Sequence, residues 1–331
     1  MKTIRWGILG CGKIARKFAS DLKWVANAQL IAVAAREQST ADAFAHDFPV
    51  RYKHGSYQAL VENAEVDIVY IATPHAFHYE HTLLCLKHKK AVLCEKAFAI
   101  NYKQAKEMIE TAKRENVFLM EAFWTKFLPH YQKMKEMIAE GKIGTIQNIA
   151  TNFGFIPTRP IAPRIYDPQL GGGSLLDIGV YPIFLVLDLL GRPDEIEAHA
   201  TFSDQGTDSQ CAVQFSYHSG ALAQLFSTFH SNLATAADIG GDCGRILLTH
   251  RFHGPTTNLE YYPGIVDTRE TISFEAAKGN GYEYEAQHAT DCLLQGMTES
   301  PIRPFSDTLL LMETLDRIRV KAGIYYPADD H

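Results

Sequence analysis

The chain has 331 residues, which is enough for two domains of ordinary size, each with its own hydrophobic core. Hydrophobic side chains make up 46% of the residues and charged side chains 21%, the balance of a soluble globular protein. The formal net charge of −6 argues against a nucleic-acid-binding surface, because a phosphate backbone is bound by a basic face.

The first third of the chain alternates short apolar runs with amphipathic stretches. The short runs, which are often β-branched, are predicted strands at 4–9, 29–35, 66–73, 90–95 and 117–121. The stretches between them carry apolar residues at helical spacing and are predicted helices at 14–24, 40–47, 79–87 and 103–114. Strands that alternate with helices in this way pair in parallel, so we expect an α/β fold with a doubly wound parallel sheet over residues 1–123.

After residue 123 the pattern changes to longer alternating stretches. Helices are predicted at 129–140, from near Ser174, and at 306–321; strands are predicted at 145–155, 211–217, 222–230 and 245–252. Residues 217–220, Tyr-His-Ser-Gly, are a hairpin turn signal. Successive strands predict a second, α+β domain over 124–331 with a large, mostly antiparallel sheet, and we expect the last helix to pack back near the first domain.

The cysteine spacing and the apolar segments indicate the cellular compartment of the protein. The six cysteines lie far apart with no CxxC pair, so neither a disulfide framework nor a zinc site is expected. The apolar run at the start is a short strand ending in glycines and does not resemble a signal peptide. The most apolar segment, 175–190, contains Asp177, Pro182 and Asp188, which favours a buried helix over a membrane span. A cytoplasmic protein with reduced thiols and no membrane partner is expected.

A glycine cluster follows the first predicted strand. Residues 10–15 read Gly-Cys-Gly-Lys-Ile-Ala and match G-x-G-x-x-G/A directly between a strand and a helix. The first glycine permits a tight turn, the second lets the backbone approach a pyrophosphate, and Ala15 keeps the helix close to the strand. A bare turn is the alternative, but the context favours a Rossmann dinucleotide site formed by Gly10, Cys11, Gly12, Lys13 and Ile14.

The end of the second predicted strand indicates which dinucleotide is bound. An NAD enzyme usually places Asp or Glu here to bind the ribose hydroxyls, whereas this chain has Ala35 followed by Arg36. Ala35 cannot repel a 2′-phosphate, and Arg36 can pair with it and stack on adenine. Unless Arg36 is only a solvated charge, NADP(H) is favoured over NAD(H).

Two further strand ends carry candidate residues, because ligands of open α/β sheets lie beyond the carboxyl ends of the strands. The strand at 66–73 leads into Thr73, Pro74, His75 and His78, which should face the cofactor. His75, His78 and His81 invite a metal interpretation, but no carboxylate or cysteine completes a ligand set, so no metal is expected.

The strand at 90–95 ends in Glu95 and Lys96. Most neighbouring Glu-Lys pairs are solvated surface pairs, but this one lies at the sheet edge that hosts the cofactor. A lysine there can hold a substrate oxygen and ease proton transfer.

A glycine-rich segment, Gly171-Gly172-Gly173, precedes the apolar helix of the second domain. Ser174 with Asp177 three residues on fits a variant capping box, which is the structural alternative. Asp177 and Tyr181 are four residues apart and share one helix face, where Pro182 can bend the helix. With a lysine opposite, they form a plausible group for moving a proton.

Taken together, these motifs resemble the Gfo/Idh/MocA oxidoreductases over nearly the whole chain. The resemblance rests on the Gly-x-Gly turn with Ala15, Thr73-Pro74 with His78, Glu95-Lys96 and "GGGSLLDIGVYP". Within the family, "MEAFWTKFLPHY" and "LLDIGVYPI" are most similar to the branch of dimeric dihydrodiol dehydrogenases and NADP-dependent xylose dehydrogenases.

The resemblance implies roles for particular residues. Lys96 and Tyr181 would be catalytic, with Tyr181 as acid/base; Asp177 would orient substrate and lysine; Trp124 would lie near the nicotinamide; and Arg36 matches a position associated with NADP preference. A homodimer through the open sheet of the second domain is also implied. The chain departs from the family at Ala97, where proline is usual.

The expected activity is therefore hydride transfer between NADP(H) and a hydroxyl or carbonyl carbon of a sugar or a cyclic trans-diol. Two alternatives stay open. A non-catalytic NADP(H) sensor would bind cofactor without turnover, although it would not need Lys96, Asp177 and Tyr181 together. A reductase of an imine or of a conjugated double bond would differ in its product.

Overall fold

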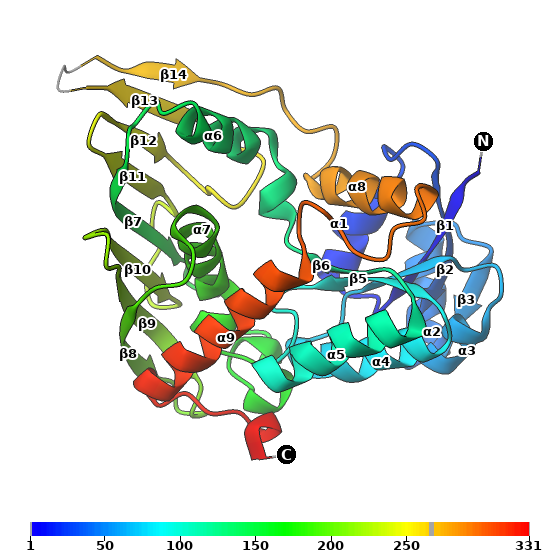
Figure 1. Ribbon diagram of the computed structural model, residues 1–331. Helices are drawn as coiled ribbons and strands as arrows, with labels where there is room; N and C mark the ends of the chain where they lie inside the picture. Colours follow the sequence, from blue (N-terminus) through cyan, green and yellow to red (C-terminus); the bar gives the residue numbers. More distant parts are fainter. Residues whose placement is uncertain (1, 265–267, 331) are drawn as a thin grey trace. The chain divides into compact units, whose positions relative to one another are not determined.

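The computed structural model describes residues 2–264 and 268–330, which form two compact units (Figure 1). One unit contains the residues up to Trp124 together with Ala277–Leu309, and the other contains Thr125–Ala276 and the residues from Leu310 onward. The predicted division after residue 123 did not include this return of the chain to its first unit.

The first unit is built on a six-stranded parallel sheet with the strand order β3-β2-β1-β4-β5-β6. Its strands are β1 (Ile4–Leu9), β2 (Ala28–Ala34), β3 (Tyr52–His54), β4 (Ile68–Ile71), β5 (Ala91–Glu95) and β6 (Leu119–Ala122). The strand order reverses between β1 and β4, and ligands of such sheets bind beyond the carboxyl ends at this point. The predicted α/β fold class is confirmed.

The helices that connect these strands pack through apolar stripes. They are α1 (Lys13–Leu22), α2 (Gln38–Asp47), α3 (Tyr57–Glu62), α4 (His78–Lys87) and α5 (Tyr102–Glu115). In α1, Ala15, Phe18 and Leu22 recur at helical spacing and are buried. The Phe18 ring stacks on Tyr70 of β4 with the ring centroids 3.7 Å apart, which places the core of this unit against the central strands.

Helix α8 (Tyr282–Leu294) belongs to the first unit although it lies far along the chain. The carboxylate of Asp21, in α1, accepts the backbone N–H groups of Asn280 at 2.7 Å and of Tyr282 at 3.0 Å. After α8, the Arg303 guanidinium donates to Oε2 of Glu121 in β6 at 2.5 Å. These contacts between distant segments fix α8 against the parallel sheet.

The second unit contains an eight-stranded sheet with the order β14-β13-β12-β11-β7-β10-β9-β8. Among the strands that the structure describes, only β7 and β10 pair in parallel, so the predicted mostly antiparallel sheet is confirmed. Its strands are β7 (Ile146–Gly154), β8 (Glu195–Phe202), β9 (Asp208–Ser216), β10 (Leu222–Thr228), β11 (Ala237–Gly241), β12 (Gly244–Leu248), β13 (Leu259–Pro263) and β14 (Glu270–Ile272).

This unit also contains α6 (Pro129–Ala139), which precedes the sheet in the chain, and α7 (Val180–Leu190), which lies between β7 and β8 in the chain and packs against β7 and β10. The segment Pro168–Leu190 is long and apolar enough to cross a membrane, but 83% of its apolar window is buried inside the structure, as in a core helix. Its buried position matches the prediction for 175–190. The last long helix, α9 (Phe305–Ala322), runs from residues of the first unit into residues of the second.

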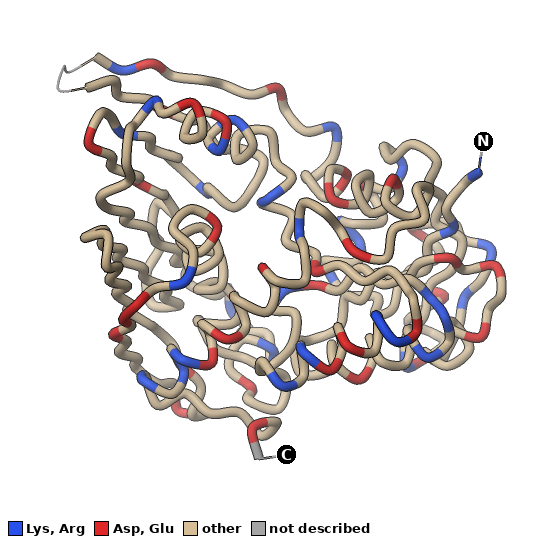
Figure 2. The backbone as a smooth tube through the Cα atoms, viewed as in Figure 1, with Lys and Arg blue, Asp and Glu red and all other residues tan. Residues whose placement is uncertain are grey.

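Several predicted elements differ from the observed ones. The strand predicted at 66–73 is limited to β4, and the strand predicted at 245–252 ends at Leu248. The short helix α3, the strands β3, β8, β11, β13 and β14, and helix α8 were not predicted. In α8, the buried face includes Glu283 and Glu285, so hydrophobic periodicity does not reveal it. Lysine and arginine are interspersed with aspartate and glutamate along the described chain (Figure 2).

The buried Glu121–Arg303 ion pair should contribute far more to the free energy of unfolding than an ion pair at the surface. Replacement of Arg303 by methionine leaves a carboxylate that is 0% exposed without its cation, which should cost about 3–5 kcal/mol of unfolding free energy. The matched control is Arg192→Met, which removes an exposed two-bond pair with Glu313 and should cost about 1 kcal/mol or less. Urea denaturation measures both; equal losses would contradict this assignment.

Candidate functional site

The turn after β1 has the geometry that a dinucleotide cradle requires. Gly10 has φ +96°, and a Cβ there would lie 3.0 Å from Cγ2 of Thr73 and 3.1 Å from the carbonyl oxygen of Ala72. Its N–H donates to Ala34 at 2.9 Å. At Gly12 an added Cβ would meet no atom within 4 Å. Position 10 therefore requires glycine for its backbone, whereas Gly12 leaves open space beside the start of α1.

Helix α1 begins directly after Gly12 and carries no acidic residue in its first turn. Of its first two residues, Lys13 is exposed and Ile14 is half-buried. The Cys11 thiol lies 3.5 Å from the carbonyl oxygen of Ala34, and burial raises the pKa of this thiol to about 11. The N-terminus of α1 thus offers backbone N–H groups, without competing carboxylates, to an anionic group.

The end of β2 presents a cation. Ala35 is buried and Arg36 is exposed. Within residues 2–264 and 268–330, Arg36 makes no hydrogen bond or ion pair. A guanidinium left available here suits a ribose 2′-phosphate, and no carboxylate stands at Ala35 to oppose it.

His78 connects the loop after β4 to the loop after β5. Its Nε2 lies 2.8 Å from the carbonyl oxygen of Thr73, and its Nδ1 lies 2.8 Å from that of Ala97. The ring is fully buried, and burial lowers its pKa to about 4. The neutral ring has one N–H and donates it to one of these two carbonyl oxygens, and in this buried position His78 packs between the two loops. Thr73, Pro74 and His75 stay half-buried at the same sheet edge.

Glu95 and Lys96 stand at the carboxyl end of β5. The Glu95 carboxylate accepts from the hydroxyl of Tyr70 and, at 3.2 Å, from the backbone N–H of Lys96. Burial raises the pKa of Glu95. Lys96 is half-buried, and its peptide bond to Ala97 is cis. The pair is therefore part of the sheet edge and not a solvated surface pair.

Sequence reasoning missed two residues of α8 that belong to this region. The Glu285 carboxyl is fully buried and makes no hydrogen bond to any residue that the structure describes. Burial, together with the nearby charges of Glu95 and Glu121, raises its pKa well above the usual value. Tyr282 stacks on Trp124 with the ring centroids 4.6 Å apart and an interplanar angle of 10°. This stack holds the predicted Trp124 in a buried position.

The second unit carries the other two predicted catalytic residues. A π-helical turn, Leu175–Gly179, leads into α7, so Asp177 and Tyr181 lie across a π/α junction and not on a regular helix face. Nη1 of Arg164 lies 3.1 Å from each carboxylate oxygen of Asp177. The Tyr181 ring is buried against Phe153 and His253, with centroids 5.7 Å and 4.7 Å away.

The capping box that was the structural alternative at Ser174 is not formed. Ser174 has helical backbone angles and makes no side-chain cap bond; its hydroxyl donates to Asp208 at 2.8 Å. Asp208, Arg164 and His253 were not identified from the sequence, because each is distant in the chain from the segment that it contacts.

The structure groups the predicted residues in two places. The first unit brings the Gly10–Ile14 turn, Arg36, Thr73 to His78 and Glu95-Lys96 to the carboxyl edge of its parallel sheet, with Trp124 stacked on α8. The second unit brings Asp177 and Tyr181 together at the start of α7.

Comparisons with known proteins agree with these two parts. Residues 4–123 match the model of an oxidoreductase family with an NAD-binding Rossmann fold, and residues 131–247 match the GFO/IDH/MocA C-terminal domain. The chain is 34% identical to a trans-1,2-dihydrobenzene-1,2-diol dehydrogenase of Xenopus tropicalis and 33% identical to that of Mus musculus, covering 98% of this chain and 99% of each relative.

Solved structures share the whole fold. A 3-ketoreductase from Actinomadura kijaniata, KijD10, solved with NADP and TDP-benzene, has a TM-score of 0.88 at 28% identity over 98% of this chain and 100% of its own. An aldose-aldose oxidoreductase from Caulobacter crescentus has the same TM-score at 22% identity, covering 97% and 98%, and supports the fold alone. The chain belongs to the Gfo/Idh/MocA family and is an NAD(P)-dependent oxidoreductase.

Proposed function

We propose that the protein is an NADP(H)-dependent dehydrogenase that acts on a hydroxyl-bearing carbon of a sugar or a cyclic trans-diol. The observation that carries the cofactor choice is the exposed Arg36, which pairs with no residue that the structure describes and which stands where an NAD enzyme has an acidic residue. The substrate class is supported by relatives named as dehydrogenases of a trans-diol and by a 3-ketoreductase of the same fold that was solved with NADP and TDP-benzene.

The residues of the glycine turn fit the cofactor. The open space at Gly12 and the uncapped start of α1 suit the pyrophosphate, and Arg36 suits the 2′-phosphate. We assign the remaining cofactor contacts to Thr73, Pro74, His75, Glu95, Lys96 and Trp124, with His78 acting through the loops that it joins. When bound, the nicotinamide supplies hydride chemistry.

We assign Tyr181 as the residue that exchanges a proton with the substrate hydroxyl. Its phenol exchanges this proton during turnover, and Lys96 is assigned to hold the substrate oxygen by its charge. Asp177, fixed by Arg164, orients the reacting groups.

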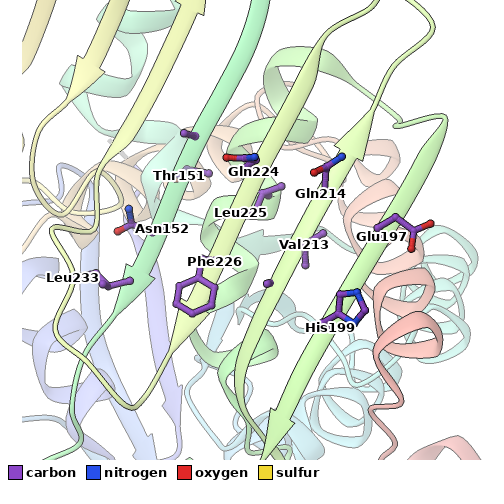
Figure 3. Close-up of a pocket in the computed structure, with 12 residues that line it drawn as sticks. Thr151, Asn152, Glu197, His199, Val213, Gln214, Gln224, Leu225, Phe226 and Leu233 are labelled. Atoms are coloured by element: carbon purple, nitrogen blue, oxygen red, sulfur yellow. The ribbon is translucent and has the colours of Figure 1, made fainter.

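The open face of the eight-stranded sheet is proposed as a homodimer interface. Figure 3 shows its side chains, among them His199, Gln214 and Phe226, on the face opposite α7. Residues alternate between buried and exposed along β8 and β10, and on this face Leu222 is 48% exposed. A second copy would cover the apolar side chains of Leu222 and Phe226. A cytoplasmic location is proposed as well, because all six cysteines are free.

The proposed activity is tested by the initial rate of NADPH formation with pentoses, hexoses and trans-dihydrodiols, each repeated with NAD+. One substrate class should turn over with a clear preference for NADP+. Arg36→Ala should lower that preference about tenfold to a hundredfold, as expected for losing a hydrogen-bonded charge pair. The control is Arg51→Ala, an exposed arginine that pairs with Glu65 and should leave the preference unchanged.

Cofactor binding without turnover on the whole panel would instead indicate a sensor. Turnover of imines or conjugated alkenes alone would indicate a different reductase. An unchanged cofactor preference in Arg36→Ala would overturn the assignment of Arg36.

Tyr181→Phe should lower kcat several hundredfold, roughly the contribution of one acid–base group, while the Kd for NADP+ stays unchanged. Tyr262→Phe, which removes a hydroxyl bonded to Glu260 in β13, should retain normal kcat. Stopped-flow and fluorescence titration measure the two quantities. Near-normal turnover of Tyr181→Phe would refute its role.

Leu222→Asp should convert the dimer to a monomer, because it places a charge in a desolvated sheet interface. The matched control is Val320→Asp in α9, where the side chain is 71% exposed and lies off the sheet. Sedimentation velocity distinguishes the two states. A wild-type monomer, or a dimer that survives Leu222→Asp, would contradict this interface.

A further inference from the structure

The helix that carries Asp177 and Tyr181 is capped by a residue from a neighbouring strand. Oδ2 of Asp208, the first residue of β9, accepts the backbone N–H of Leu175 at 2.7 Å and the hydroxyl of Ser174 at 2.8 Å. The Ser174 hydroxyl also lies 3.0 Å from that of Ser227 in β10. The first turn is thereby tied to two strands of the sheet.

The surrounding backbone is shaped to admit this carboxylate. Gly173 has φ +116°, and a Cβ at this position would lie 2.2 Å from Oδ1 of Asp208. The same Cβ would lie 3.0 Å from the hydroxyl of Tyr326, which donates to the carbonyl oxygen of Gly172 at 2.7 Å. The glycine-rich lead-in is therefore packed directly on the carboxyl group, which is fully buried.

We propose that Asp208 is a positioning residue for the proton transfer assigned to Tyr181, and that its ionised carboxylate holds the π-helical turn in the working arrangement. The inference rests on the proposed function. A carboxylate at a helix N-terminus is favoured by the helix dipole and accepts stronger hydrogen bonds than a neutral group. Neutralising it weakens both bonds to the turn that carries Asp177.

Asp208 can change its charge at mildly acidic pH. Burial raises its pKa to about 6, against the bonds from Ser174 and Leu175 that lower it. Cys211 on the same strand and Tyr326 face it, with Arg319 and Asp329 beside Tyr326. Burial holds the pKa of both Cys211 and Tyr326 above their usual values, so of these three groups only Asp208 titrates near pH 6.

The direction of the pH effect follows from the two bonds. Oδ1 makes no hydrogen bond to any described residue, so it is the oxygen that takes the proton. The carboxylate form, present above about pH 6, makes the strong cap, and the acid form, present below it, makes a weaker one. Turnover should therefore fall as the pH is lowered through about 6.

The experiment measures kcat and KM from pH 4.5 to 9 for the wild-type chain and for Asp208→Asn, with the substrate that the panel identifies. Asp208→Asn keeps the shape but not the charge, so kcat at pH 8 should fall roughly tenfold, as for one lost charged hydrogen bond. In this variant the fall of kcat below about pH 6, which is the acid limb of the pH profile, should disappear, while KM for NADP+ stays unchanged. Ser174→Ala should lower kcat less and retain the limb, because the carboxylate persists.

Ser209→Ala is the matched control. Ser209 is the next residue of β9, is equally buried, and bonds to Thr201 instead of the helix, so its replacement should leave kcat and the limb unchanged. An Asp208→Asn variant that keeps the acid limb overturns the proposal, whether its kcat is normal or merely lowered by a loss of stability.

Hydrogen exchange of residues 175–181 gives a readout without turnover. Protection in the wild-type chain should decrease below about pH 6, after correction for intrinsic exchange, and should be low at all pH values in Asp208→Asn. Equal protection in both chains overturns the proposal. A wild-type chain with no turnover on the panel overturns the proposed function, while the exchange data still decide whether Asp208 holds the turn.

Discussion

Two helices that carry candidate site residues begin with N–H groups that their own cap residues do not satisfy, and in each case a buried aspartate from elsewhere in the chain accepts them. Asp21 in α1 holds the start of α8, and Asp208 in β9 holds the start of the turn before α7. An unpaired N–H in the interior is costly. The positions of Tyr282, Asp177 and Tyr181 therefore depend on carboxylates that belong to the cores of their units.

This dependence explains how far the sequence could predict the structure. The parallel sheet and its glycine turn follow from local signals: short apolar strands, helical periodicity and the spacing of Gly10, Gly12 and Ala15. The place of Arg36 at the sheet edge could also be predicted from local sequence, because Arg36 directly follows the end of a predicted strand. The predicted boundaries of β1 and α6 differ from the observed ones by at most a residue.

The remaining parts of the site depend on contacts between distant residues. Ser174 and Asp177 fit the local rule for a capping box, yet the Ser174 hydroxyl donates to Asp208 of β9 and the Asp177 carboxylate accepts from Arg164. Arg164 and His253 are recognisable only once the fold places them beside Asp177 and Tyr181. Helix α8 escaped prediction because its buried face carries glutamates, which a hydrophobic pattern assigns to solvent.

The path of the chain has a consequence for biosynthesis. The chain leaves the first unit after Trp124, returns at Ala277 and leaves again after Leu309. During translation, the strands of the parallel sheet emerge from the ribosome first. Helix α8 and Arg303, the partner of Glu121, are synthesised only much later. Meanwhile all eight strands of the second sheet have been synthesised. The nascent nucleotide-binding half thus lacks part of its core until nearly the whole polypeptide exists, and an N-terminal fragment that ends near residue 124 would lack α8 and Arg303 permanently.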